Sequence, residues 1–173
     1  MNRVSDALDS FRCALDKDIE NFLRFRAISY IERGWCAVYL MIDEQEFDEG
    51  RIKIEAYFTL SHKPLIPPED LPKSKIKDAS GFKDSESIHF VLIGQLGKRI
   101  DQLKDGRYDS SVISSHNILD DAFSITEKSS ALIPCRCALV ECSDNEKVHK
   151  VYQDYGFKFF QFDGDHYQFY RRI

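Results

Sequence analysis

Serines gather just before a predicted helix near the middle of the sequence. Five polar residues precede or open a helix that we expect over about residues 116–129: Ser110, Ser111, Ser114, Ser115 and His116. A helix N-terminus presents unpaired amides and a partial positive charge, which suits a pyrophosphate. Small side chains let those amides approach a phosphate, and the hydroxyls add donors. The pattern also fits a cluster that only caps and turns the chain, with His116 as a solvated residue.

A second polar group stands at the carboxyl end of an apolar run over residues 135–142. The chain there reads Glu141-Cys142-Ser143-Asp144-Asn145, and aromatic and apolar residues follow at helical spacing up to Gly156-Phe157. Asp144 or Asn145 is of the type that caps a helix, and Gly156 is of the type that ends one. The sequence therefore predicts a strand, a tight polar turn and a helix that reaches Tyr155.

Hydrophobic periodicity predicts the elements that position these groups. Asp16 is of the N-cap type for a helix over Lys17–Arg33, whose apolar residues recur at helical spacing up to Gly34. Apolar runs predict strands over residues 35–43, 51–61, 88–96 and 135–142. A final hairpin is expected over residues 157–162 and 166–170, around Asp163-Gly164-Asp165.

Three stretches have the composition of loops. An acidic segment ending in Glu49-Gly50 predicts a hairpin turn, and residues 98–115 are polar. Four prolines interrupt residues 62–86, where we expect a long functional loop: Pro64, Pro67, Pro68 and Pro72. The order of strands and helices predicts a sheet with parallel or mixed pairing, covered by helices on both faces.

Length, charge and hydropathy limit the class of protein. The 173 residues suffice for a single domain over 1–173 with a core of its own. The net charge is −5, and an acidic balance argues against nucleic acid as a partner. No run approaches the roughly 20 apolar residues of a membrane span, and the stretch from Met1 to Asp6 leads into no signal-peptide core. We therefore expect a cytoplasmic protein without a membrane partner.

The five cysteines form neither a disulfide framework nor a zinc-binding pattern. Cys135 and Cys137 lie two apart in an apolar run, so a strand would place both on one face as small packed hydrophobes. A zinc site built from them would need a matching second pair, which the sequence lacks. We therefore expect no metal site.

The turn and helix after residue 141 resemble the GNAT acetyltransferase superfamily. In that family an acidic-Asn turn precedes a helix with Tyr seven residues after the Asn, followed by Gly-Phe; Asn145, Tyr152 and Gly156-Phe157 match this spacing. Ile93-Gly94-Gln95-Leu96-Gly97 is similar to the family strand that pairs with pantetheine. Ile118-Leu119-Asp120-Asp121-Ala122 is similar to the start of the helix after the pyrophosphate loop.

The N-terminal half resembles a GNAT subset that includes bacterial toxin acetyltransferases. The similar residues are Phe11, Cys13, Leu15-Asp16, Ile19, Phe22-Leu23 and Tyr57-Phe58-Thr59-Leu60-Ser61. Together with the C-terminal pattern, the resemblance covers most of the chain. It implies an α/β (α+β) fold with a mixed, mostly antiparallel central sheet and helices on both faces.

The resemblance also implies an activity, namely transfer of an acetyl group from acetyl-CoA to an amine of a small molecule or protein. Backbone around Leu96, Gly97 and Lys98 would hold pantetheine, and the residues from Ser110 to His116 would hold pyrophosphate. Asn145 would contact the cofactor, and Tyr152 would protonate the leaving thiolate. The structural alternatives are capping for Asn145 and packing on the last hairpin for Tyr152.

One departure from the family concerns the phosphate loop, and several functions stay open. The family's last two fixed loop positions, Gly and then Gly or Ala, fall here on Ile113 and Ser115, and a serine keeps the amide geometry only at negative φ. The general base is undecided among His89, Glu55 and Glu141. The alternatives are a toxin-like acetyltransferase of aminoacyl-tRNA, and a non-catalytic acyl-CoA-binding or protein-interaction module. A homodimer is also open.

Overall fold

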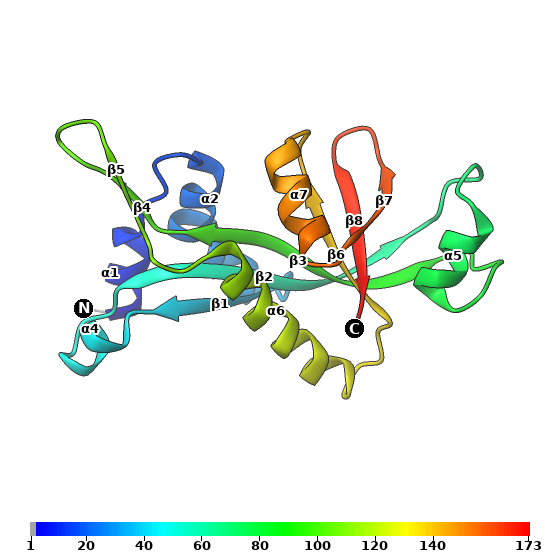
Figure 1. Cartoon of the computed structure of the whole chain (residues 1–173). Coiled ribbons are helices and arrows are strands. Elements are labelled where there is room, and N and C mark those ends of the chain that lie inside the picture. The colour runs from blue at the N-terminus through cyan, green and yellow to red at the C-terminus, as the bar shows by residue number, and fades with distance from the viewer. Residues whose placement is uncertain (1–2) are drawn as a thin grey trace. The chain divides into compact units, whose positions relative to one another are not determined.

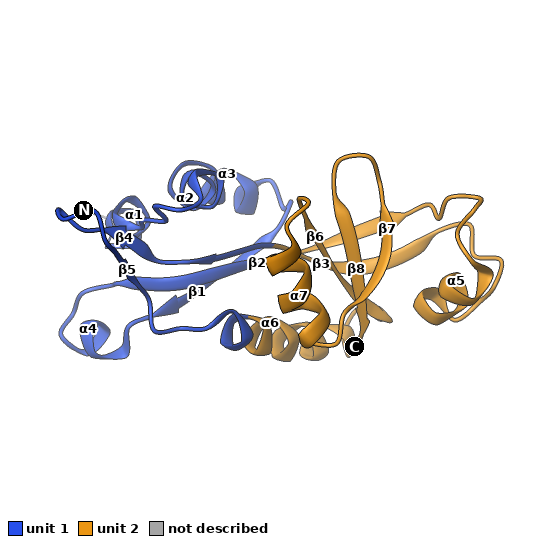
Figure 2. Cartoon of the chain, turned by 45° about the horizontal axis from the view of Figure 1, so that its top comes forward, with its two compact units in different colours: residues 1–59, 95–118 blue, residues 60–94, 119–173 orange. Residues whose placement is uncertain are grey.

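The computed structural model describes residues 3–173, so Met1 and Asn2 of the expected N-terminal pattern lie outside the described residues. The chain divides into two compact units (Figure 2). The first unit comprises the chain up to Thr59 together with Gln95–Ile118, and the second comprises Leu60–Gly94 and Leu119–Ile173. Within residues 3–173, no helix combines the length and apolar character that a membrane crossing requires.

The larger sheet has the strand order β1-β2-β3-β6-β8-β7 (Figure 1). Its strands are β1 (Ala37–Ile42), β2 (Ile54–Leu65), β3 (Ile88–Lys98), β6 (Cys137–Cys142), β7 (Lys158–Phe162) and β8 (Tyr167–Arg172). β3 and β6 pair in parallel, whereas β8 is antiparallel to both β6 and β7. β2 and β3 run through both units. The predicted mixed, mostly antiparallel sheet is confirmed.

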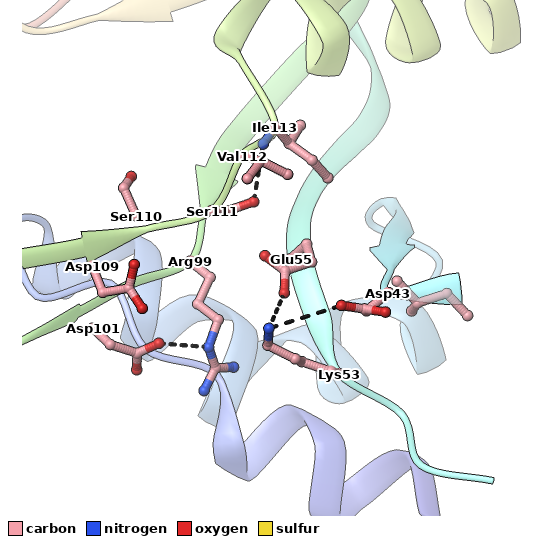
Figure 3. Close-up of a pocket in the computed structure, with 11 residues that line it drawn as sticks. Asp43, Lys53, Glu55, Arg99, Asp101, Asp109, Ser110, Ser111, Val112 and Ile113 are labelled. Carbon is pink, nitrogen blue, oxygen red and sulfur yellow. Dashed lines mark hydrogen bonds and ion pairs between the residues drawn. The ribbon is translucent and has the colours of Figure 1, made fainter. Parts of the chain in front are cut away.

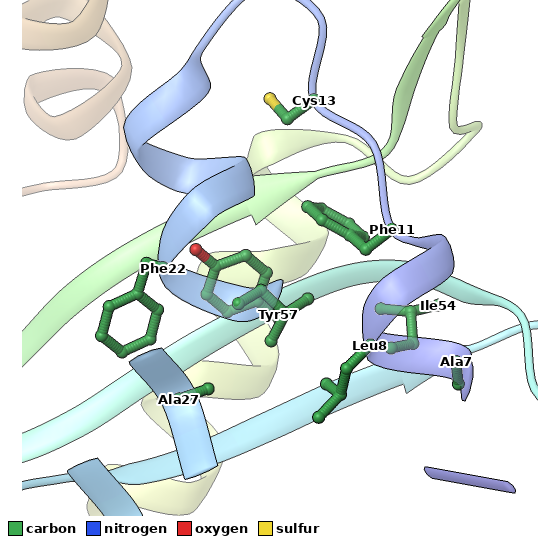
Figure 4. Close-up of a cluster of buried hydrophobic side chains, with 9 residues drawn as sticks. Ala7, Leu8, Phe11, Cys13, Phe22, Ala27, Ile54 and Tyr57 are labelled. Carbon is green, nitrogen blue, oxygen red and sulfur yellow. The ribbon is translucent and has the colours of Figure 1, made fainter. Parts of the chain in front are cut away.

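The core of the first unit forms where helical segments cover β2 (Figure 4). The helical segments are α1 (Arg3–Ser10), α2 (Lys17–Asn21), the π-helical turn η1 (Phe22–Arg26) and α3 (Ala27–Glu32). The fully buried Tyr57 ring lies against the rings of Phe11 and Phe22, and its hydroxyl donates to the Ile19 carbonyl at 2.8 Å. Burial raises the pKa of Tyr57, so this hydroxyl remains a hydrogen-bond donor.

The helix predicted over Lys17–Arg33 forms, but it is not one regular α-helix. Asp16 caps it as predicted, accepting from the amides of Asp18 and Ile19. The π-helical turn then inserts an extra residue, which rotates the following positions about the helix axis. Ile31, an apolar residue near the end of this helix, is 49% exposed.

The second unit has helices on opposite faces of β8. α7 (Glu146–Asp154) places Tyr152 against Phe169, whereas α5 (Lys73–Ser80) bonds to Tyr170 through Asp78. Phe169 and Tyr170 are consecutive residues of one strand, so their side chains point to opposite faces. α6 (Ser115–Ser130) begins in the first unit and continues in the second.

Three predicted loops contain regular structure. The acidic turn before β2 holds α4 (Glu44–Asp48), which Asp43 caps through the Glu46 amide. The long loop predicted over residues 62–86 holds the end of β2 and all of α5, which Gly81 ends at φ 94°. The loop predicted over residues 98–115 holds the hairpin of β4 (Ile100–Gln102) and β5 (Tyr108–Ser110). Short polar elements leave too little periodicity to be recognised in the sequence.

The prediction for the paired cysteines is correct at one position and wrong at the other. Cys137 is fully buried in β6, and its thiol donates to the Ala79 carbonyl at 3.4 Å. Cys135 precedes the strand and is partly exposed, because β6 begins only at residue 137. All five cysteines are free thiols.

Candidate functional site

The carboxyl half of β3 turns two backbone amides away from β2. The Gln95 amide donates to Thr59 Oγ1 at 2.8 Å, and the Arg99 amide donates to the Glu55 carbonyl at 2.8 Å, both on β2. Because backbone groups of successive strand residues point to opposite edges, the amides of Leu96 and Lys98 face the other edge. The parallel ladder with β6 extends only from Phe90 to Ile93. Leu96 and Lys98 therefore present an edge of the kind that an extended ligand can pair with.

Gly97 has a packing role that the sequence did not reveal. A Cβ atom at this position would lie 2.5 Å from Ile19 Cγ2 and 2.5 Å from Tyr57 Cε1. Any side chain here would therefore collide with α2 and with the buried tyrosine of the first core. The glycine is explained by close packing inside the first unit, and a contact with a cofactor would use only its backbone.

The serine segment before α6 is stabilised by its own side chains. Ser114 Oγ accepts from the Asn117 amide at 3.1 Å, and Asn117 Oδ1 accepts from the Ser114 amide at 3.0 Å. Ser111 Oγ accepts from the Ile113 amide at 3.2 Å. The serine cluster therefore caps and turns the chain, as one of the two interpretations predicted. The Ser-x-x-Asn spacing behind these reciprocal bonds is present in the sequence, but the sequence analysis did not recognise it.

The backbone of the serine segment is unstrained, although it lacks the family's glycines. Within residues 3–173, every positive φ belongs to a glycine. Ile113 and Ser115 therefore hold negative φ values, the condition under which a side chain is tolerated there. Ser110, Ser114, Ser115 and His116 are exposed, and Ser111 is half-buried. The segment can present amides and hydroxyls to a solvent-borne anion.

A cavity of ≈ 370 Å³ adjoins this segment in the first unit (Figure 3). Lys53 and Arg99 line it, but both are paired with carboxylates: Lys53 Nζ lies 2.6 Å from Glu55, and Arg99 Nε lies 2.7 Å from Asp101. The cationic groups of the cavity are thus neutralised within the chain. Donors for a phosphate would come instead from the amides and hydroxyls of residues 110–116.

Asn145 caps α7 in the second unit. Its Oδ1 accepts from the amides of Lys147 and Val148 at 3.1 and 3.4 Å, and Gly156 follows the helix at φ 90°. The side-chain oxygen is therefore occupied by capping, and the Nδ2 amide is the group left for a cofactor contact. The predicted turn and helix are in place, whereas the cofactor contact stays a prediction.

Tyr152 is a buried residue of α7 that lies among other aromatic side chains. Its side chain is 8% exposed and packs against Phe157 and Phe169. Burial, and then the negative charge that a Cys142 thiolate would carry, raise the pKa of Tyr152 above its ordinary value. The phenol is protonated at neutral pH and can donate a proton, but burial makes it a weaker acid than a free phenol. The ring also packs on the last hairpin, as the structural alternative predicts. Packing of the ring and proton donation by its hydroxyl do not exclude each other.

The three candidate general bases are all engaged. Glu55 is 8% exposed and pairs with Lys53. Both oxygens of Glu141 accept from Lys63 Nζ, at 2.6 and 2.8 Å, and Gln168 Nε2 donates to it at 2.6 Å. His89 pairs with His62. These contacts do not identify which of the three residues would act as the general base.

The predicted site residues fall into two groups. The first unit holds Leu96, Gly97, Lys98 and the segment from Ser110 to His116, and the second unit holds Asn145 and Tyr152. Sequence reasoning missed Thr59 and Asn117, which shape the first group through their side chains. Only Asn117 left a local signal, its spacing from Ser114.

Neither a family model nor a curated protein matches this sequence. Solved structures do match. The structure of AtaT complexed with acetyl-methionyl-tRNAfMet has a TM-score of 0.70 at 18% identity, covering 95% of this chain and 86% of that chain. The chain has a GNAT-type acetyltransferase fold.

Two further structures support the GNAT fold of this chain. AtaTR bound with AcCoA has a TM-score of 0.70 at 17% identity, covering 99% of this chain and 90% of that chain. A tyrosine-to-phenylalanine mutant of KacT has a TM-score of 0.69 at 15% identity, covering 95% and 86%. The GNAT resemblance of the sequence, including its likeness to toxin acetyltransferases, is therefore confirmed at the level of the fold.

Proposed function

We propose that this chain is an N-acetyltransferase that uses acetyl-CoA and acts as one domain over residues 1–173. The observation that carries the proposal is the edge of β3, where the amides of Leu96 and Lys98 face away from β2. Pantetheine is an extended chain with two amide groups, so it can pair with such an edge as an added strand would. The GNAT fold and the AcCoA complex of AtaTR support the same choice of ligand.

The segment from Ser110 to His116 would hold the pyrophosphate. Its negative φ values and its exposed serine hydroxyls support this role. A phosphate oxygen would compete with Ser114 Oγ for the Asn117 amide, so binding would open or share the existing cap. When bound, acetyl-CoA supplies an acetyl group already activated as a thioester.

Tyr152 would supply the proton that the leaving thiolate requires. The phenol is protonated at neutral pH, and its burial limits competition from water. Asn145 would orient the cofactor through Nδ2 while its Oδ1 continues to cap α7. The acceptor is an amine of a small molecule or protein.

The experiment that tests this proposal measures release of CoA thiol with a panel of amines, for wild type and Tyr152→Phe. Loss of a general acid costs about 100-fold or more in turnover. The matched control is Tyr155→Phe, because Tyr155 packs against the same Phe157 and lies at the end of the same helix. Turnover by wild type that Tyr152→Phe leaves unchanged would contradict the assignment of the acid.

A second acceptor is favoured by one observation, the similarity to AtaT complexed with acetyl-methionyl-tRNAfMet. In this version the amine is the α-amino group of an aminoacyl-tRNA. The net charge of −5 argues against it. Radiolabelled acetyl transfer to charged tRNA, steeply reduced by added salt, would establish this acceptor; transfer to free amines alone would exclude it.

The non-catalytic alternative gives a distinct outcome in the same experiments. Binding of acetyl-CoA without turnover on any amine or charged tRNA would favour a non-catalytic acyl-CoA-binding or protein-interaction module. The homodimer is tested separately by light scattering of the purified chain, with a mass near 20.1 kDa contradicting it.

A further inference from the structure

Two histidines face each other across neighbouring strands in the second unit. His62 lies on β2 and His89 on β3, and both side chains are exposed. His89 Nδ1 and His62 Nε2 are 3.3 Å apart, and the ring centroids are 5.1 Å apart with 24° between the planes. The two residues are 27 positions apart in the sequence, so no local spacing marks them as a pair.

We propose that His62 and His89 form a surface site for a divalent transition metal, for which zinc is the probe. Two imidazole nitrogens bound at about 2.05 Å to a tetrahedral metal lie about 3.3 Å from each other. The observed separation of 3.3 Å matches this value.

The coordination chemistry requires only a change of tautomer. In the metal-free pair, one of the facing nitrogens donates its proton to the other. Zinc needs a lone pair on both, so His89 must carry its proton on Nε2 and His62 on Nδ1. Both rings are exposed, so their outer nitrogens can exchange these protons with solvent. The bound ion would link β2 to β3 through two coordinate bonds.

The rest of the coordination shell comes from outside this cluster. Within residues 3–173, no group of three or more His, Cys, Asp or Glu side chains is placed to hold a metal ion. The two histidines therefore supply two ligands, and water or a small solvent-borne anion supplies the others. A site with two open positions binds more weakly than a closed structural zinc site, and it remains accessible to exchange.

The test is calorimetric titration of EDTA-stripped full-length chain with zinc chloride at about pH 8, where free imidazole is neutral. We expect one ion per chain, and about tenfold or greater weakening for either His62→Ala or His89→Ala, since each removes one of two ligands. Nitrogen-edited NMR of the imidazoles would show two of the five histidines changing with zinc. Thermal melts of each variant establish that it is folded.

Two controls separate the pair from other ligands. His166→Ala removes an exposed histidine in the β7–β8 turn, and Cys135→Ser removes a partly exposed thiol whose Sγ donates to the His89 carbonyl. Both should bind zinc as wild type does. Equal zinc binding by the His62→Ala/His89→Ala double variant, or loss of binding in Cys135→Ser, would overturn the proposal.

Discussion

The contact of α2 with β2 in the first unit and the contact of α5 with β8 in the second unit have a different physical basis. In the first, α2 packs on β2 through apolar contacts, and Gly97 leaves the space that Ile19 and Tyr57 fill. In the second, charge assists: the carboxylate of Asp78 on α5 accepts from the Tyr170 hydroxyl at 2.7 Å and pairs with Lys158 and Arg172. The contact of α2 with β2 should therefore respond to changes in volume, and the contacts of Asp78 to changes in charge and pH.

The chain carries a probe that distinguishes the two responses. Trp35 is its single tryptophan, belongs to the first unit, and lies against the ring of Tyr30. Tryptophan fluorescence therefore reports on the first unit, whereas far-ultraviolet circular dichroism reports on both.

The largest effect is expected from Gly97→Ala. The added Cβ would meet Ile19 and Tyr57 at 2.5 Å, and overpacking of a buried site costs about 3 kcal/mol at the upper end of the usual range. Urea unfolding followed by Trp35 fluorescence measures the loss.

A second substitution shows whether the crowding is the cause. Ile19→Ala removes one of the two clashing groups, so the double variant Gly97→Ala/Ile19→Ala should lose less stability than the sum of the single losses. Additive losses would contradict the packing account of this glycine.

The second unit should be weakened by acid. The hydrogen bond from Tyr170, and then the contact with Lys158, hold the pKa of Asp78 below its ordinary value. The stabilisation is therefore complete above the unfolded-state pKa of about 3.9 and is lost as pH falls through the lower folded-state pKa. At pH 7 we expect Asp78→Asn to cost about 1–2 kcal/mol, and the difference from wild type to shrink as pH falls below about 4.

The matched control for Asp78 is an exposed pair in the same region. Asp84 lies 2.6 Å from Lys73, with both side chains more than two-thirds exposed. Asp84→Asn should leave the unfolding free energy close to that of wild type, because exposed ion pairs contribute little. The unfolding free energies are measured by circular dichroism. Equal losses for Asp78→Asn and Asp84→Asn would show that the contacts of Asp78 stabilise the protein no more than an exposed ion pair does.

The smallest effect concerns the cap of α7 and separates its two roles. Asn145→Ala removes the cap and should cost about 1 kcal/mol. Asn145→Asp keeps the capping oxygen but replaces the Nδ2 donor by a second carboxylate oxygen. It should melt like wild type while its affinity for acetyl-CoA falls about tenfold. If Asn145→Asp binds acetyl-CoA as tightly as wild type does, Asn145 caps α7 but does not contact the cofactor.

The sequence predicted the elements whose ends are marked locally. The helix after Asn145 ends at Gly156, and the last hairpin turns at Gly164, both glycines at positive φ. Asp16 likewise marked the start of α2. In each case the signal lies within a few residues of the feature that it predicts, so periodicity and cap chemistry suffice.

The rest depends on contacts between residues far apart in the chain. α5 has only eight residues, and its Asp78 bonds to Tyr170, 92 positions away. The role of Gly97 depends on Ile19 and Tyr57, and the histidine pair spans 27 positions. The π-helical turn is also invisible locally, because its sequence Phe22–Arg26 continues the pattern of an ordinary helix. Single-sequence patterns carry no information about such partners.

The measurement that tests the central claim most directly is calorimetric titration of acetyl-CoA into wild type, Leu96→Pro and Leu96→Ala. Proline removes the amide that faces away from β2, whereas alanine keeps it, and proline is tolerated where that edge of a strand is unpaired. We predict micromolar binding, about −8 kcal/mol, for wild type and Leu96→Ala, and at least about tenfold weaker binding for a cooperatively melting Leu96→Pro. A folded wild type that binds no acetyl-CoA up to millimolar concentration, or a Leu96→Pro that binds as wild type does, would contradict the account.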